Sequence, residues 1–189
     1  MQRAMAAVAT IFAAGIAISA PTQRLPLTSV SHLAIYAADA AKSEQFYVHD
    51  LGAVKGIDPE NPEGTRYYFS PVQYIELLPL PAGAPSINRL DHIAYNTTDA
   101  EAMRLYLASR KVRVPRRVSS GTDGSHWFEV TDPEGNRVQF VQPPASPPAT
   151  PMNPLSGRII HVGFIVHNRD NQDSFWRNLL GFRPYWYGG

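Results

Sequence analysis

The chain contains no cysteine among its 189 residues. Disulfide bridges, thiolate metal ligands, cysteine nucleophiles and a lipid-modified cysteine are therefore all excluded. Excess charge is also lacking, because 17 basic and 16 acidic side chains leave a formal net charge of +1. A nucleic-acid surface usually needs a large positive excess, so the composition predicts no nucleic-acid partner.

Common catalytic loops are missing as well. The sequence has no glycine-rich loop of the phosphate-binding type and no Gly-x-Ser-x-Gly elbow that would present a serine nucleophile. What remains is a chain of 44% hydrophobic and 17% charged residues, which is the composition of a globular protein able to bury one or two modest cores.

The N-terminus has the layout of a secretory signal peptide. Residues 1–20 carry one positive charge at Arg3, then an uncharged stretch that ends in small residues. Cleavage after Ser19 is favoured, because cleavage one residue later would place Pro21 first. About 17 apolar residues are also the lower limit for a membrane span, so a retained N-terminal anchor is the alternative. In both cases the folded part is expected outside the cytoplasm, in a periplasmic or extracellular location, with no integral membrane partner.

Three segments of the chain repeat one another without gaps. They begin at Val30, Leu90 and Ile159. The alignment brings three histidines into register and, fourteen and fifteen residues later, three bulky pairs: His32, His92 and His161, followed by Phe46-Tyr47, Tyr106-Leu107 and Phe175-Trp176. Each segment reads as a strand followed by a helix, with N-cap candidates at Asp39, Asp99 and Asn168 or Asp170.

The first two segments continue into short strand-rich runs. The first continuation, "TRYYFSPVQYIELLPL", contains Glu76, and the second, "SHWFEVTDPEGNRVQFVQ", has a strong hairpin turn at its Asp-Pro-Glu-Gly. We therefore expect an α+β domain over residues 27–142, built from two modules at 27–80 and 88–142. Each module is a strand, a helix and a meander of strands.

A proline-rich linker, residues 143–157, precedes the third segment. Residues 158–189 contain only the strand and helix of a further unit, without a meander to cover its hydrophobic face. This predicts an incomplete third unit, the start of a second domain. Either the parent polypeptide continues, or this tail borrows its partner strands from elsewhere.

The repeated histidines point to a metal site. A small residue, Ala34, Ala94 or Gly163, stands two positions after each of them on the same strand face and leaves space beside the imidazole. Glu76 is a lone carboxylate among apolar residues, and its burial would require a cation. Two histidines and a carboxylate from separate strands form the ligand set of a divalent metal with open positions. A single strand histidine is usually a core residue, but recurrence in register favours His32, Glu76 and His92 as ligands.

Two other features have competing interpretations. Gln139 is predicted either to add a neutral oxygen ligand or only to line the cavity. The basic cluster "SRKVRVPRRV" follows the second helix, where a solvated cationic face is favoured over a contact with an anionic substrate.

These residues resemble the vicinal oxygen chelate superfamily, which includes glyoxalase I, bleomycin-binding proteins and extradiol dioxygenases. The resemblance is carried by "SHLAIY", "DHIAYN", "YIEL" and "TDPEGNRVQFV". It implies paired βαβββ modules that form a cupped mixed sheet around a cleft. It also implies a divalent metal of undetermined identity, iron, manganese, nickel, cobalt or zinc, with ligands at His32, Glu76, His92 and Gln139.

Gln139 departs from the pattern of glyoxalase I-like members, which have a second glutamate there as ligand and proton carrier. An amide cannot take up a proton at useful pH, so that reaction is disfavoured. The resemblance also implies that His161 begins a second pair of modules. Modules of this family pair within one chain or between two chains, so a homodimer stays open.

The expected function is that of a metal-dependent enzyme acting on a small molecule that chelates the metal through two oxygens. One alternative is a metal-free binding protein with aromatic cavity walls, for which Tyr36, Tyr74 and Trp127 are the candidates. The other is a structural pair of modules without catalysis.

Overall fold

The computed structural model describes residues 23–84, 89–146, 154–163 and 165–185. The predicted signal peptide or anchor, residues 1–20, lies outside the described residues. Among the helices that the structure does describe, none has the length and apolar character needed to cross a membrane.

The first module runs from β1 to β4. Its elements are β1 (Leu27–Ala37), α1 (Ala40–Glu44), η1 (Gln45–Asp50), β2 (Val54–Ile57), β3 (Thr65–Ser70) and β4 (Gln73–Pro79). The α1 helix begins after the predicted N-cap Asp39, whose side chain accepts a hydrogen bond from the Lys42 backbone N–H.

The second module repeats this order. Its elements are β5 (Leu90–Thr97), α2 (Ala100–Ser109), β6 (Ser119–Ser120), β7 (His126–Thr131) and β8 (Arg137–Gln142). Asp99 caps α2 by accepting a hydrogen bond from the Ala102 backbone N–H. The predicted hairpin turn joins β7 and β8, with Gly135 at a φ of +85° that favours glycine.

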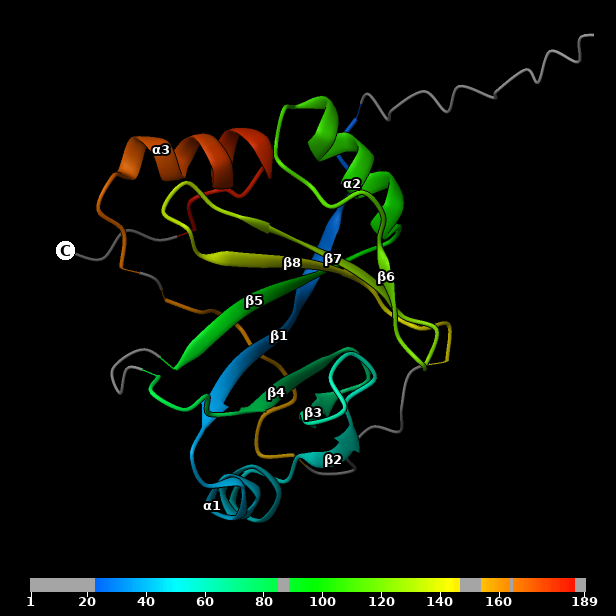
Figure 1. Cartoon of the computed structure of the whole chain (residues 1–189), viewed down its shortest axis with the longest axis vertical. Helices are drawn as coiled ribbons and strands as arrows, with labels where there is room; N and C mark the ends of the chain where they lie inside the picture. The colour runs from blue at the N-terminus through cyan, green and yellow to red at the C-terminus, as the bar shows by residue number, and fades with distance from the viewer. Residues whose placement is uncertain (1–22, 85–88, 147–153, 164, 186–189) are drawn as a thin grey trace, which may run out of the picture.

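The two modules join along their first strands into one eight-stranded mixed sheet, ordered β2-β3-β4-β1-β5-β8-β7-β6. At the centre β1 and β5 pair antiparallel, with Leu33 opposite Ile93, so the two modules are related by an approximate two-fold axis. The sheet curls into a cup, with α1 outside one half and α2 and α3 outside the other (Figure 1). The predicted α+β fold of paired βαβββ modules is therefore confirmed, and the modules pair within the chain.

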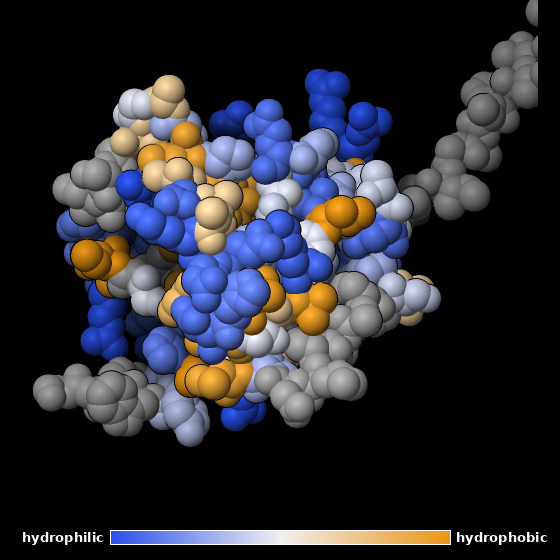
Figure 2. Space-filling view, turned by 90° about the horizontal axis from the view of Figure 1, so that it is seen from below, coloured by the Kyte–Doolittle hydropathy of each residue, from blue (hydrophilic) through white to orange (hydrophobic). Residues whose placement is uncertain are grey.

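The core lies between the outside of the sheet and the helices. Ile93 and Phe140 of the sheet and Met103 and Leu107 of α2 are completely buried in one cluster. Figure 2 views the molecule from the side on which α1 lies in Figure 1, and this face is mostly hydrophilic with separate hydrophobic groups. In the core against the helices the strands contribute alternate residues, such as Ile93 and Tyr95 of β5, and α2 contributes one face.

The helix predicted for the third unit forms, as α3 (Arg169–Asp173) continued by η2 (Ser174–Leu179). Asn168 is its N-cap, since its side chain accepts a hydrogen bond from the Asn171 backbone N–H. Phe175 and Leu180 are buried in the core of the second module, with only 7% and 1% of their surface exposed. The hydrophobic face of this helix is thus covered by the outside of the preceding sheet.

The strand predicted at the start of the third unit is wrong for the described residues 158–163 and 165–167, which have no strand structure. The backbone of Ile159 exchanges two hydrogen bonds with the side chain of Gln73, each 3.2 Å long. At the other end, the Glu134 carboxylate accepts hydrogen bonds from the backbone N–H groups of His167 and Asn168. These contacts fix the segment to β4 and to the β7–β8 turn, so it crosses the sheet instead of pairing at an edge.

Candidate metal centre

Three neighbouring strands position the candidate ligands. Within the sheet, β1 lies between β4 and β5. Ala34 of β1 is paired with Glu76 on one side and with His92 on the other. Ala34 is completely buried, and its methyl group leaves room for the longer side chains that meet beside it. The small residue after the repeated histidine therefore creates the space for the site.

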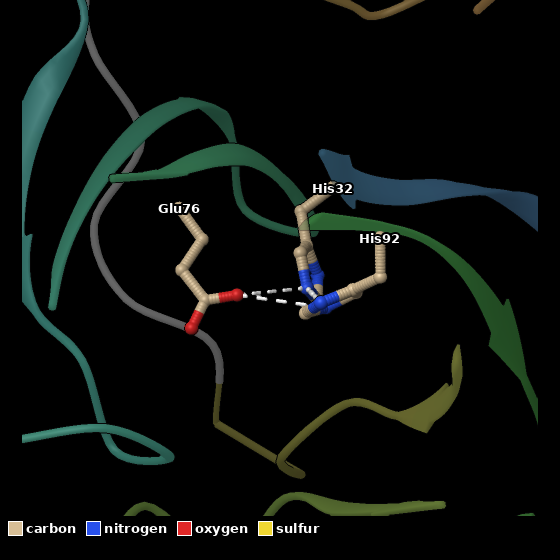
Figure 3. A group of neighbouring side chains, drawn as sticks. All are labelled: His32, Glu76 and His92. Carbon is tan, nitrogen blue, oxygen red and sulfur yellow. Dashed lines mark hydrogen bonds and ion pairs between the residues drawn. The ribbon is translucent and has the colours of Figure 1, made fainter. Parts of the chain in front are cut away.

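The three side chains point toward one another inside the cup (Figure 3). The Nε2 atoms of His32 and His92 lie 3.0 Å apart. Glu76 Oε2 lies 3.3 Å from His32 Nε2 and 3.6 Å from His92 Nε2. All three side chains are buried, with exposed fractions between 0% and 5%. This group could hold a metal ion, because each residue contributes one ligand atom and these atoms all lie within 4.8 Å of one another.

The surroundings of the three residues fit a divalent cation. His92 Nδ1 lies 2.8 Å from a carboxylate oxygen of Asp91, which can only accept, so Nδ1 donates and Nε2 keeps its lone pair. His32 Nδ1 lies 3.2 Å from the Ser31 hydroxyl. When Nδ1 carries the proton and donates to this hydroxyl, His32 Nε2 also keeps its lone pair. Glu76 Oε2 is buried and has no hydrogen-bond partner among the described residues. Lone pairs thus converge on one point, and a cation satisfies them.

The electrostatics of the site agree with this fit. Burial lowers the pKa of His32 well below its usual range, and the adjacent ring of His92 lowers it further. Burial and the neighbouring carboxyl of Asp58 raise the pKa of Glu76. Without a cation the site therefore favours a neutral imidazole and a protonated carboxyl, and a metal ion replaces that proton.

Gln139 lies on β8 and lines the same cavity as Glu76 and His92. Its amide nitrogen donates a 2.8 Å hydrogen bond to Glu60 Oε2. Its Oε1 is buried without a hydrogen-bond partner in the described part of the chain. The contact with Glu60 therefore orients the amide so that its oxygen is available to a cation or a ligand.

A buried charged network, which was not predicted from the sequence, lies next to the candidate ligands. Arg66 of β3 donates to Asp58 Oδ1 at 3.1 Å and to Glu60 Oε1 at 2.7 Å. Both carboxylates come from the loop between β2 and β3. Arg66 interrupts the apolar run of "TRYYF", which is the same signal that identified Glu76, but nothing local pairs it with Asp58 or Glu60.

The predicted aromatic residues occupy different positions. Tyr36 and Trp127 line a cavity of about 610 Å³ above the ligands, and the hydroxyl of Tyr36 donates to Asp91. Tyr74 does not line this cavity. It stacks on His32 with ring centroids 4.4 Å apart. The Arg66 guanidinium lies 4.3 Å from the centroid of the Tyr74 ring. Tyr74 thus supports a candidate ligand from behind.

Replacing Asp91 with asparagine is expected to weaken divalent metal binding by about 10- to 100-fold, because the His92 ring loses the carboxylate that orients it and increases its basicity. Competition with a chromogenic chelator would measure the change. Glu129→Gln is the matched control, since Glu129 also pairs with Arg137 but has no contact with His92. An equal effect of both variants would show that only the Arg137 ion pairs matter.

Comparisons with known proteins agree with this fold. The family model described as the Glyoxalase/Bleomycin resistance protein/Dioxygenase superfamily matches residues 29–140. A selenomethionine structure of a methylmalonyl-CoA epimerase is 19% identical, with a TM-score of 0.53, and the match covers 65% of this chain and 99% of that one. A methylmalonyl-CoA epimerase in complex with methylmalonyl-CoA and NH4+ is 20% identical, with a TM-score of 0.51 and coverage of 65% and 99%. The Streptomyces coelicolor epimerase in complex with 2-nitronate-propionyl-CoA is 20% identical, with a TM-score of 0.50 and coverage of 64% and 100%. No protein of curated function matches the chain significantly.

Proposed function

The chain belongs to the glyoxalase/bleomycin resistance protein/dioxygenase superfamily, and from this premise we propose that it is a metal-dependent enzyme acting on a small molecule with two adjacent oxygens. The observation that carries the proposal is the buried convergence of His32, Glu76 and His92, of which Glu76 and His92 line a cavity. A divalent metal bound there would supply Lewis-acid chemistry, stabilising negative charge that develops on the substrate oxygens.

Residues of this chain would bind the cation, orient the His92 ring and line the cavity. His32, Glu76 and His92 would hold the cation, with the free amide oxygen of Gln139 as a fourth candidate ligand. Asp91 keeps the His92 ring in the tautomer that presents Nε2 inward. The cavity above them is large enough for a small substrate, and Trp127 forms part of its wall.

Glu60 is the candidate proton carrier. The amide of Gln139 cannot perform this task, but it holds the carboxylate of Glu60, which lines the same cavity. Arg66 and Gln139 each donate to one oxygen of Glu60, and each oxygen keeps a second lone pair. A carboxylate supplied by the β2–β3 loop thus stands next to the position where the resemblance implies a glutamate. This supports an isomerase-type reaction, in which Glu60 takes a proton from a substrate carbon and returns it.

The predicted export of the protein is part of this proposal. Residues 1–20 favour a site of action outside the cytoplasm, where a small oxygenated molecule other than a coenzyme A thioester is the better candidate substrate. The likeness to methylmalonyl-CoA epimerases supports the fold, so methylmalonyl-CoA serves as a probe of the chemistry and not as the proposed substrate.

Two measurements test the proposal. Metal analysis of the purified protein should find one divalent ion per chain, and its absence would favour the metal-free binding protein. The second measurement is NMR detection of deuterium uptake from D₂O into methylmalonyl-CoA and into the glutathione hemithioacetal of methylglyoxal. Oxygen uptake with catechol should be absent, and its presence without deuterium exchange would favour a dioxygenase.

Replacing Glu60 with glutamine is expected to slow the deuterium exchange by about 100-fold or more while the metal content stays unchanged, because the variant cannot carry a proton. Glu63→Gln is the control, since Glu63 lines the same cavity but is exposed. Exchange that survives in the Glu60 variant would assign proton transfer to another group.

A further inference from the structure

A second groove, of about 790 Å³, lies next to the candidate active-site cavity. The two share Trp127, Glu129 and Arg137 in their linings, so they lie side by side along β7. The groove follows β7 on one side and the chain segment from Arg113 to Arg116 on the other. This segment belongs to the basic cluster "SRKVRVPRRV", for which the sequence favours a solvated cationic face over a contact with an anionic substrate.

The groove exists because β6 is short. It pairs with only the first two residues of β7, Ser119 with Trp127 and Ser120 with His126. Before Ser119 the chain diverges from β7 and is held toward α2, where Arg104 donates a 3.0 Å hydrogen bond to the carbonyl of Pro115. The edge of β7 beyond Trp127 therefore stays open, and the diverging segment forms the opposite wall.

Two of the three arginines that line the groove have no acidic partner among the described residues. Arg113 and Arg116 line it, are exposed, and have no hydrogen bond or ion pair with any residue in the described part of the chain. Arg137 is different, because Asp91 and Glu129 already occupy its guanidinium. A guanidinium group is planar and can donate two parallel hydrogen bonds to two oxygens of a phosphate or carboxylate. Two guanidinium groups without a partner among the residues that the structure describes, on one wall of a groove that borders the cavity, form a site for an anion.

We propose that this groove binds a phosphate-bearing tail of the substrate. The anionic oxygens contact Arg113 and Arg116, the chain of the substrate passes the indole of Trp127, and its reactive end enters the cavity. The placement of the reactive end rests on the proposed function, whereas the anion site rests only on the groove. A di- or triphosphate group fits better than a single phosphate, since both guanidinium groups are free and each can take a separate set of oxygens.

The test is isothermal titration calorimetry of pyrophosphate against the full chain freed of metal with a chelator. Metal-free protein is used because pyrophosphate binds metal ions itself. We expect saturable binding to the wild type and at least a tenfold weaker affinity in the double variant Arg113→Ala/Arg116→Ala. The matched control is Arg117→Ala/Arg158→Ala, which removes the same charge at exposed positions outside the groove and should change the affinity less than about twofold.

Equal weakening in both double variants would overturn the proposal, because it would show only a general charge effect. Absence of wild-type binding at about 10 mM pyrophosphate would also overturn it. Citrate is titrated in parallel. If citrate binds as tightly as pyrophosphate, the proposal of a phosphate ligand is wrong and the groove binds carboxylates instead. None of these results depends on a metal ion, so failure here and failure of the proposed metal centre are observed separately.

Discussion

Replacing Glu76 with glutamine is expected to weaken divalent metal binding by at least about 100-fold. This loss is larger than that expected for Asp91→Asn, because Asp91 acts only through the His92 ring. Glutamine keeps the size of the side chain and an oxygen in reach of the site. It removes the negative charge that offsets a dication in a buried environment, where water cannot replace that charge. The effect should therefore come from charge and not from packing.

The same substitution should leave the metal-free protein at least as stable as the metal-free wild type. Glu76 is almost fully buried and its Oε2 has no hydrogen-bond partner among the described residues. Burial raises its pKa, so at neutral pH the metal-free wild type must take up a proton at this carboxyl on folding, a cost that a neutral amide avoids. Metal content by mass spectrometry and chelator competition, together with urea unfolding, would measure both effects. Glu63→Gln makes the same chemical change at an exposed residue of the cavity rim and should alter neither quantity. Normal metal content in the Glu76 variant would remove the basis for the proposed centre.

Replacing Phe175 with alanine is expected to reduce the free energy of unfolding by about 3 kcal/mol, the typical cost of removing a buried aromatic ring. Phe175 is 7% exposed and packs in the cluster of β5, α2, β7 and β8, although it comes from the third unit. The loss would show that the tail is part of the folded domain. Urea unfolding followed by circular dichroism would measure it.

The repeat supplies an unusually close control for this variant. Phe46 occupies the same position of the first unit but is 50% exposed, so Phe46→Ala should cost less than about 1 kcal/mol. Similar losses in the two variants would contradict the packing argument. A negligible loss at Phe175 would mean that the helix of the third unit contributes little to the stability of the domain.

Local signals in the sequence predicted a large part of this protein. The repeat gave the paired modules, because each unit carries the alternation of a strand followed by the spacing of a helix. Asp39, Asp99 and Asn168 were identifiable as N-caps, since that role needs only a short polar side chain before a helix. His32, His92 and Glu76 were found because they are polar residues in apolar strands, where burial requires a partner.

Other features depend on contacts between distant segments. Arg66 and Glu60 belong to the site because a loop and a strand edge meet there, and Tyr74 lies behind His32 instead of in the cavity. The described residues 158–163 and 165–167 form no third strand, and the side chains of Gln73 and Glu134 bind the backbone of this segment. No local pattern contains this information.

The sequence by itself determined the two modules, their helix starts and the residue types of the candidate metal centre, since these follow from periodicity and from the cost of burying polar groups. Only the tertiary structure decided that β1 lies between β4 and β5, which brings Glu76 and His92 to either side of Ala34. It also decided that Gln139 holds Glu60 and that the arginines after α2 border a groove. The physical reason is that strand order and loop placement are set by the packing of the whole sheet, which no single segment encodes.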